Sequence, residues 1–348
     1  MKNLFISDIT DGQQVKDLFL IREVSRAETR AGKPYLTLKV MDKSGEIAGR
    51  VWDDADRWLE QCAVGRVVAL SAQAQSYKNI LQLKINSLQA VSEDEVDMAL
   101  FVPSTSEDIE EMTKELLKFA RSVADEFLRK LLLKLFQDKN FLPLFQKAPA
   151  AKFMHHAYLG GLLEHTLHVT RLADQVAALY PSVDRSLLLA GAMLHDVGKV
   201  KEFSFASHPF DYSDQGRLMG HMVIGVEMVQ ARISKIKNFP AETGVRLKHL
   251  ILSHHGRYEF GAPSLPMLHE AFILNFIDDM DAKINYMERL SSQVKEEGYQ
   301  WSEYQRNLER FLFLRGHKEQ EESQPETKAR EEVPRPPTLW DLSAKTKQ

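Results

Sequence analysis

Apolar and polar positions follow two different periods along this chain, and the change of period divides it. Up to about residue 95, apolar side chains stand in short alternating or β-branched runs, which are typical of strands. Turn residues such as Ala31–Pro34 and Lys43–Gly45 separate these runs. The pattern predicts five strands, over residues 17–29, 34–42, 46–53, 66–77 and 80–91.

A short helix is predicted near Asp54–Gln61, between the third and fourth strands. Five strands with a helix at that point favour a small closed Greek-key barrel of the OB type. A β-sandwich built from the same strands is the alternative. In either case, residues 1–95 are expected to form a small all-β domain.

Beyond the strands, the apolar period changes to three and four residues, as one face of a helix requires. The change is first seen at Ile109, Met112, Leu116, Phe119, Val123 and Phe127. The same pattern continues to about residue 315. We therefore expect an all-α helical bundle over residues 109–317.

Two segments show neither the strand period nor the helical period. Residues 96–108 end the acidic stretch EDEVDMALFVPSTSED, and we expect a linker in which Thr105 or Ser106 caps the following helix. Residues 318–348 are charged and contain four prolines, which predicts a disordered tail. The expected protein is multidomain, with a barrel, a linker, a helical bundle and a tail.

Composition narrows the class of protein. The 348 residues suffice for two cores, and no run approaches 18 uninterrupted apolar residues, so we expect no membrane span. The first residues, MKNLFISDITDGQQ, lack the apolar core of a signal peptide. A single cysteine, Cys62, excludes an intramolecular disulfide and suits a cytoplasmic protein. Because the net charge is −4, nucleic-acid binding would need a local surface or metal ions.

Histidines and aspartates recur on the predicted helices, with apolar neighbours on both sides. The adjacent pair in MLHDVGK is the most unusual, since a buried helix has no structural use for an imidazole beside a carboxylate. Imidazole and carboxylate together suit Mn, Fe, Zn, Co or Ni, whereas oxygen ligands alone would favour Mg or Ca. The candidates are His165, His195, Asp196, His221, His254, His255, Asp278, Asp279 and Asp281.

Asp196 has two carboxylate oxygens and can bridge two ions. One ion would then be held by His165, His195, Asp196 and Asp278. The second would be held by Asp196, His221, His254 and His255. Two ions about 3.5–4 Å apart can polarise a phosphate and generate hydroxide between them.

These residues resemble the H…HD…D pattern of the HD phosphohydrolase superfamily. His165, His195–Asp196 and Asp278 match that pattern. Asp278 is selected because FIDDMDA is similar to the family's apolar–small–Asp segment, and Asp279 is its rival. The remaining histidines, His221, His254 and His255, resemble the additional ligands of the two-metal branches.

The text HDVGK also matches the superfamily. Gly198 allows close approach of the backbone, and Lys199 is placed to meet a phosphate oxygen. A solvated lysine at a helix end is the alternative interpretation of Lys199.

The wider resemblance is to the YhaM-type 3′–5′ exoribonucleases of bacteria, over roughly residues 5–315. It depends on the barrel, the segment FVPSTSEDIEEM and the segment MHHAYLGGLLEHTLHV. It implies hydrolysis of phosphodiester bonds of single-stranded RNA, or also of DNA, from the 3′ end. It implies one or two divalent transition metals per chain, with Mn expected first and Co, Fe or Ni as alternatives, and it permits a homo-oligomer.

Under this hypothesis Asp196 is essential because both ions depend on it. Lys199 would neutralise charge that develops on the phosphate. Either His255 or His156 would protonate the leaving oxygen. His155 and His156 are expected to support the ligands or to contact the substrate rather than to bind metal directly, and packing in the core is the alternative.

The barrel would bind a single strand by stacking bases on aromatic side chains beside basic ones. The candidates are Phe19, Tyr35, Trp52, Tyr77, Lys33, Arg50 and Lys78. Residues 1–95 hold 13 Lys or Arg and 14 Asp or Glu, so the electrostatic support is weak. The resemblance, rather than the charge, favours binding.

Two alternatives of different classes stay open. The chain could be an HD hydrolase of a small nucleotide, with the barrel as a regulatory domain. It could instead be a non-catalytic single-strand-binding adaptor, although the presence of every ligand argues against a degenerate site.

Overall fold

The structure is a computed structural model that describes residues 2–316 apart from residues 30, 60, 79, 93–95, 153, 206–209, 293, 295 and 296. The predicted tail at 318–348 lies outside the described residues, so its disorder stays a prediction. Residues up to Glu288 form one compact unit, and those from Arg289 onward form a second.

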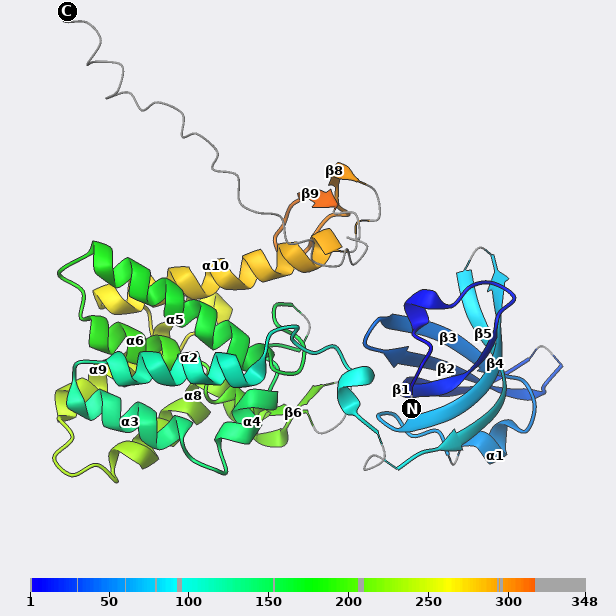
Figure 1. Cartoon of the computed structure of the whole chain (residues 1–348), viewed down its shortest axis with the longest axis horizontal. Helices are drawn as coiled ribbons and strands as arrows, with labels where there is room; N and C mark the ends of the chain where they lie inside the picture. Colours follow the sequence, from blue (N-terminus) through cyan, green and yellow to red (C-terminus); the bar gives the residue numbers. More distant parts are fainter. Residues whose placement is uncertain are drawn as a thin grey trace, which may run out of the picture. The chain divides into compact units, whose positions relative to one another are not determined.

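Five strands of the first unit close into a barrel (Figure 1). Its strand order is β1-β2-β3-β5-β4, in which β1 pairs with β4 antiparallel and β3 pairs with β5 in parallel. Helix α1 (Ala55–Leu59) lies between β3 and β4, as predicted. The closed order confirms the OB-type barrel, and the sandwich alternative is wrong. The strands are β1 (Gln14–Glu28), β2 (Pro34–Asp42), β3 (Gly45–Val51), β4 (Val67–Tyr77) and β5 (Ile80–Ala90).

Two residues singled out in the sequence lie inside this barrel. Phe19 is fully buried, and the Lys2 ammonium lies 3.8 Å from the centroid of its ring. The prediction that Phe19 stacks on a base is therefore wrong, because its side chain completes the barrel core. Cys62 is buried in the same core, and this burial raises the pKa of its thiol to about 11.

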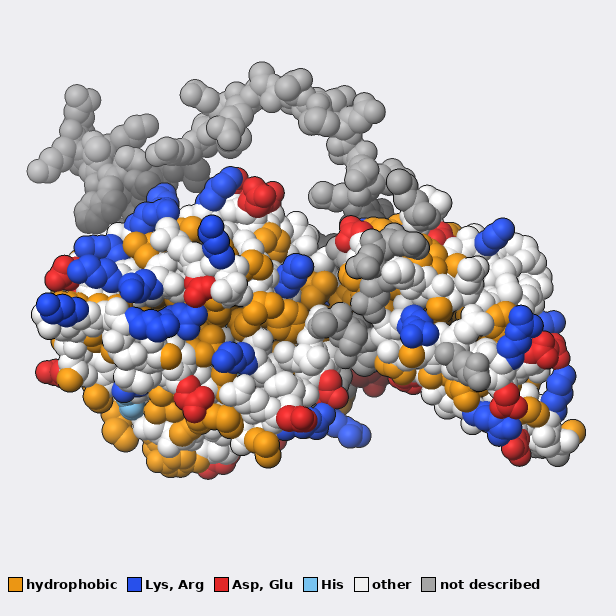
Figure 2. All heavy atoms as spheres, turned by 90° about the horizontal axis from the view of Figure 1, so that it is seen from below, with side chains coloured by type: hydrophobic (Ala, Val, Ile, Leu, Met, Phe, Trp, Pro, Cys, Tyr) orange, Lys and Arg blue, Asp and Glu red, His pale blue; other side chains and the backbone are white. Residues whose placement is uncertain are grey.

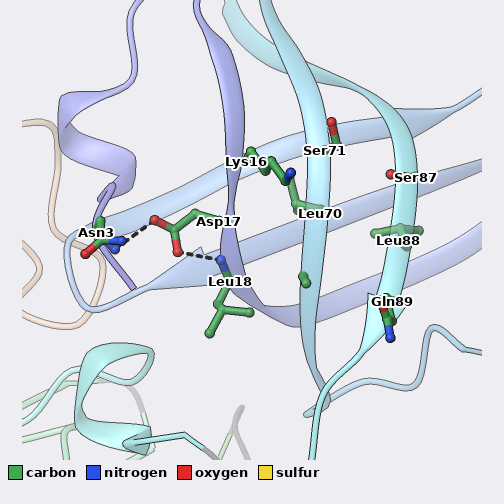
Figure 3. A pocket seen from close by; sticks show the side chains of 10 residues that line it. Asn3, Lys16, Asp17, Leu18, Leu70, Ser71, Ser87, Leu88 and Gln89 are labelled. Carbon is green, nitrogen blue, oxygen red and sulfur yellow. Dashed lines mark hydrogen bonds between the residues drawn. The ribbon is translucent and has the colours of Figure 1, made fainter. Parts of the chain in front are cut away.

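The outer face of β1, β4 and β5 carries a pocket, seen in Figure 3. Beside it, the Asp17 carboxylate accepts hydrogen bonds from the backbone N–H groups of Asn3 (2.8 Å) and Leu18 (2.6 Å). Asp17 thus fastens the segment before the barrel onto β1. The candidate metal ligands lie in the helical part of the chain and not at this pocket.

Helices dominate the rest of the first unit. Every residue of α6 from Ser186 to Leu194 is buried, so this helix forms the centre of the core. The helices are α2 (Ile109–Ser122), α3 (Glu126–Phe136), α4 (Leu142–Lys147), α5 (Gly161–Leu179), α6 (Arg185–Leu194), α7 (Lys199–Glu202), α8 (Asp214–Ile233), α9 (Ala241–Ser253) and α10 (His269–Ser292). A two-stranded sheet of β6 (Phe203–Ser204) and β7 (Asp211–Tyr212) joins α7 to α8.

The start of α2 differs from the prediction. Asp108, not Thr105 or Ser106, is the N-cap, and its carboxylate accepts from the backbone N–H groups of Glu110 and Glu111. An aspartate directly before the first turn satisfies two donors that have no partner within the helix. Thr105 accepts instead from the backbone N–H of Glu107.

The sequence predicted a helical pattern up to about residue 315, but the last helix that the structure describes ends at Ser292. Residues of the second unit form a hairpin of β8 (Gly298–Trp301) and β9 (Phe313–Gly316), with Trp301 opposite Phe313. Tyr299 and Trp301 are exposed while Leu314 is buried, which is the period of two that a strand requires. The expectation of a helical bundle up to residue 317 is therefore wrong for residues 298–316.

Candidate metal centre

All seven predicted ligands come together in the first unit. They are held by the bundle, in or directly after helices α5, α6, α8, α9 and α10. His165, His195, Asp196 and His254 are at most 1% exposed, although they are polar. Burial of this kind requires compensating partners. The full set is His165, His195, Asp196, His221, His254, His255 and Asp278.

Three ligand atoms form a first group. His165 Nε2 lies 3.2 Å from His195 Nε2 and 3.1 Å from Asp278 Oδ1, and His195 Nε2 lies 3.7 Å from Asp278 Oδ1. Two atoms that bind one transition-metal ion at about 2.1 Å lie roughly 3.0–3.4 Å apart. The first group therefore has nearly the spacing that a shared ion requires.

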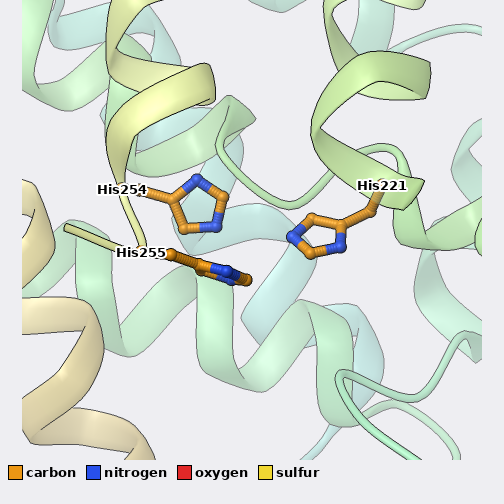
Figure 4. Close-up of side chains that lie close together, drawn as sticks. All are labelled: His221, His254 and His255. Atoms are coloured by element: carbon orange, nitrogen blue, oxygen red, sulfur yellow. The ribbon is translucent and has the colours of Figure 1, made fainter. Parts of the chain in front are cut away.

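The second group is formed by His221, His254 and His255, whose rings converge in Figure 4. One nitrogen of each ring lies within 4.8 Å of the other two. His254 and His255 are neighbours at the end of α9, and the fold brings His221 of α8 to them.

Asp196 lies between the two groups. Its Oδ2 is 3.5 Å from His165 Nε2 and 3.4 Å from His195 Nε2. Its Oδ1 is 3.4 Å from His221 Nε2 and 3.6 Å from His254 Nε2. Each carboxylate oxygen thus faces a different group, as a bridging ligand would.

Three of these atoms are buried without a hydrogen-bond partner among the described residues. They are Asp196 Oδ1, His221 Nε2 and His254 Nε2. A buried polar atom without a partner costs about 1–3 kcal/mol, so three that face one another need an explanation. A divalent cation accepts electron pairs from all three, and mixed nitrogen and oxygen donors suit a first-row transition metal. The residues present therefore fit a metal.

The opposite nitrogen of each histidine is already engaged. Nδ1 of His195, His254 and His255 donates to a backbone carbonyl, of Ala192, Ile251 and Phe260 respectively. Nδ1 of His165 and of His221 donates to a carboxylate, of Asp281 and of Glu202 respectively. The proton is thereby fixed on Nδ1, and the Nε2 lone pair is left for the centre.

Comparison with known proteins gives the family. Residues 162–283 match the family model described as HD domain, and residues 21–91 match an OB-fold nucleic acid binding domain. The "3'-5' exoribonuclease YhaM" of Listeria monocytogenes serotype 4b is 37% identical over 292 residues, which are 83% of this chain and 91% of that protein. The chain belongs to the YhaM family of 3′–5′ exoribonucleases.

Other relatives agree. The protein of the same name from Bacillus subtilis is 35% identical over 285 residues, covering 82% of this chain and 90% of its own. That from Halalkalibacterium halodurans is 33% identical over 287 residues, covering 82% and 88%. A solved replication protein A heterotrimer bound to ssDNA has a chain that matches 24% of this one and 60% of its own length at 21% identity, with a TM-score of 0.20. In the part of this YhaM-family chain that the structure describes, none of the helices combines the length and the hydropathy of a membrane span.

Lys199 lies in the centre rather than in solvent. Its Nζ is 2.5 Å from Asp196 Oδ2, and the residue is only 7% exposed. Burial alone would raise the pKa of Asp196, but the positive charge of the neighbouring Lys199 opposes it, and that pKa is held well below its ordinary value. Asp196 is therefore an ionised carboxylate in this YhaM-family centre, and Lys199 is within reach of any group it binds.

His156 cannot serve as the proton donor that the sequence suggested. It is 1% exposed, its Nε2 bonds to Asp281 at 2.9 Å and its Nδ1 to the Tyr158 hydroxyl at 2.9 Å. Both ring nitrogens are engaged, so that prediction is wrong. His155 is half-buried beside His165 instead, and burial together with the charge of Lys199 lowers the pKa of His155 to about 3.

Of the three clustered aspartates, Asp278 alone lies in the first group of ligand atoms. Asp279 is exposed and pairs with Lys283 at 2.5 Å. Asp281 lies behind His165, with Oδ2 2.7 Å from its Nδ1. The three-residue spacing of Asp278 and Asp281 places both on one helix face and could have revealed this role, whereas no signal in the sequence revealed Glu202.

The predicted nucleic-acid residues gather at one end of the barrel, Phe19 excepted. Tyr35 stacks on Trp52 with ring centroids 4.8 Å apart. The Arg50 guanidinium lies 5.7 Å from the Trp52 ring and 5.9 Å from that of Tyr77. Lys78 lies 5.7 Å from the same Tyr77 ring, and exposed Lys33 pairs with Asp53 at 2.7 Å. We call Tyr35, Arg50, Trp52, Tyr77 and Lys78 the aromatic platform.

Proposed function

We propose that this chain is a metal-dependent 3′–5′ exoribonuclease that removes nucleotides from the 3′ end of single-stranded RNA. The family membership supports the reaction. The observation that carries the proposal is the position of Asp196, whose two oxygens face two separate histidine groups and whose Oδ1 lacks a hydrogen-bond partner among the described residues.

Two ions would be held in this centre, with Mn²⁺ as the expected metal. The first would have His165, His195, Asp196 and Asp278 as ligands. The second would have Asp196, His221, His254 and His255 as ligands. Bound divalent metals supply Lewis acidity, which polarises a phosphate oxygen and favours loss of a proton from water.

The chain's own residues do the rest. Lys199, buried beside Asp196, would place a positive charge next to the scissile phosphate and offset the negative charge that develops there. His255 has Nδ1 engaged by the Phe260 carbonyl and Nε2 turned to the second group. A single free nitrogen cannot both bind a metal and protonate the leaving oxygen, so we assign His255 as a ligand only.

The aromatic platform would hold the strand upstream of the cut. Flat rings accept any base by stacking, and Arg50 and Lys78 add charge for the phosphates. This arrangement fits an enzyme that degrades strands without reading their sequence. A lone cysteine and an RNA substrate both fit the cytoplasm, and we propose that compartment.

The test uses full-length protein stripped of metal and resupplied with Mn²⁺. It is offered 5′-labelled single-stranded RNA and DNA of equal sequence, with Asp196→Ala as the control. We expect a descending ladder on RNA that is absent in the variant. Comparison with DNA reports whether the 2′-hydroxyl matters. Intact oligomers from metal-loaded protein would contradict the proposal and favour a small nucleotide as substrate, and so would full activity of Asp196→Ala.

A further inference from the structure

Each of the two groups of ligand atoms contains one histidine whose ring is hydrogen-bonded to a carboxylate. In each group, one histidine donates its Nδ1 proton to a buried carboxylate that belongs to neither of the two proposed ligand sets. In the first group His165 donates to Asp281, with Nδ1 2.7 Å from Oδ2. In the second group His221 donates to Glu202, with Nδ1 3.1 Å from Oε1. The other three histidines donate to backbone carbonyls.

Asp281 accepts from three imidazoles at once. Besides His165, it accepts from His156 Nε2 at 2.9 Å and from His168 Nδ1 at 3.1 Å. It is 8% exposed, so these bonds replace most of its contact with water. An amide in its place has one acceptor oxygen and could not receive all three donors.

Glu202 holds both the ring and the backbone of His221. Gly220, with φ +71°, breaks the helical conformation inside α8 and frees the backbone N–H of His221. That N–H donates to Glu202 Oε1 at 3.0 Å, the oxygen that also accepts from the ring. Glu202 is 6% exposed. One carboxylate therefore fixes both the backbone position of His221 and the orientation of its ring.

A carboxylate behind a histidine orients the ring and makes the opposite nitrogen a stronger ligand. We propose that Asp281 and Glu202 are positioning residues that each set the affinity of a different metal position, Asp281 through His165 and Glu202 through His221. This inference rests on the ligand assignment of the proposed function. It adds that the two positions are controlled separately, although Asp196 is common to both.

The test is a calorimetric titration of metal-stripped, full-length protein with MnCl₂. Asp281→Asn is expected to lower the affinity for one of the two bound ions by about 10–100-fold and to change the affinity for the other by no more than roughly twofold. Glu202→Gln is expected to weaken the other ion by a similar factor. The matched controls are Asp279→Asn, on the exposed side of α10, and Glu227→Gln, on the exposed side of α8. Both should titrate like the parent protein.

A double-variant cycle separates positioning from a general effect. In a His165→Ala background, Asp281→Asn should cause no further loss of affinity at the first position, since its route is already absent. In the same background, Glu202→Gln should still weaken the second position. Asp281→Glu, which keeps the carboxylate, should recover part of the lost affinity.

Several results would overturn the inference. One is an equal weakening of both ions by either variant, and another is a further loss in the His165→Ala background. A third ion that disappears with His168→Gln would make Asp281 a ligand rather than a support. Failure of both metal-free variants to fold would show that the carboxylates hold the fold instead. The titration counts ions in the absence of RNA. If the titrations give the expected result but the protein cuts no RNA, only the proposed substrate is refuted. If the parent protein binds no Mn²⁺, both the proposed function and this inference are refuted.

Discussion

Gly198, which follows α6, lies directly against the backbone of α8 at His221. A Cβ atom at Gly198 would lie 2.0 Å from the backbone oxygen of His221, and no side chain can be accommodated at that distance. The glycine of the HDVGK segment is therefore a condition for bringing His221 to Asp196. Gly161 has a similar role, since its Cβ would lie 2.1 Å from the backbone oxygen of His156.

We expect Gly198→Ala to displace His221 and to lower the free energy of unfolding by about 1–3 kcal/mol, the usual cost of forcing atoms into a packed site. The variant should lose most of its metal binding at the second group. Gly225→Ala is the matched control, because its Cβ would meet no atom closer than 3.5 Å. Chemical denaturation and a metal count test both variants, and a Gly198→Ala protein that binds two ions normally would refute the argument.

Residue types and spacing were enough to select the seven candidate ligands that the fold brings together. The pairing of His195 with Asp196 pointed to a metal because imidazole and carboxylate have no joint use in an apolar helix. The residues behind the ligands could not be found in this way. The role of His156 depends on where Asp281 lies, and that contact joins positions 125 residues apart.

Arg171 on α5 and Glu115 on α2 form a two-pronged ion pair that ties two helices of the bundle. The Arg171 Nε and a terminal guanidinium nitrogen donate to the two Glu115 oxygens at 2.8 and 2.6 Å. The hydrogen bonds from Arg171 lower the pKa of Glu115 below its ordinary value of 4.5. The pair is partly exposed, so solvent screens it and its contribution is small.

Because the pKa of Glu115 is lower in the folded protein, the pair stabilises the fold above pH 4.5 and ceases to do so as the pH falls through the lowered pKa. Glu115→Gln should therefore reduce the free energy of unfolding at pH 7 by less than about 1 kcal/mol. The difference from the parent protein should vanish in acid. Urea denaturation at pH 7 and pH 3 tests this, and a difference that grows in acid would reverse the sign.

The elements themselves were predicted unevenly. The barrel strands followed from alternation, because each has one face in the core and one in solvent. The hairpin of Tyr299 and Trp301 was missed because two strands of four residues are too short for a period of two to stand out. The cap of α2 was misplaced by a few residues, since Thr105, Ser106 and Asp108 are all good capping residues and the backbone decides among them.

The whole molecule combines a net negative charge with local positive surface. Its net charge is −4, yet Figure 2 shows Lys and Arg side chains gathered over the helical part, between hydrophobic ones. On α3, Lys130 and Lys134 line one small pocket, and Lys134 donates to the backbone oxygen of Lys235. Attraction of a nucleic acid therefore depends on local clusters and on bound cations rather than on the total charge.

Division of labour between the two domains makes a prediction about substrate length. Tyr77 of the aromatic platform is 54% exposed, and stacking on one ring contributes about 1–3 kcal/mol per base. We expect Tyr77→Ala to raise KM for a long single-stranded RNA by about 5–150-fold and to leave kcat unchanged. A di- or trinucleotide, which offers few bases for stacking, should be cut at the same rate by both proteins.

The control is Tyr180→Ala, which removes an equally exposed ring (56%) at the end of α5. It should have no effect on either substrate. A Tyr77→Ala enzyme that loses kcat on the short substrate would place Tyr77 in the chemistry instead.

The burial of Cys62 has a practical consequence. A thiol with a pKa of about 11, enclosed in the barrel core, stays protonated and out of reach of maleimide dyes at neutral pH. Because the chain has no other cysteine, one placed at exposed Ser106 would be the single reactive thiol without any prior removal of native ones. The protein is thus ready for site-specific fluorophore attachment, and the shortening of individual strands could be followed one molecule at a time.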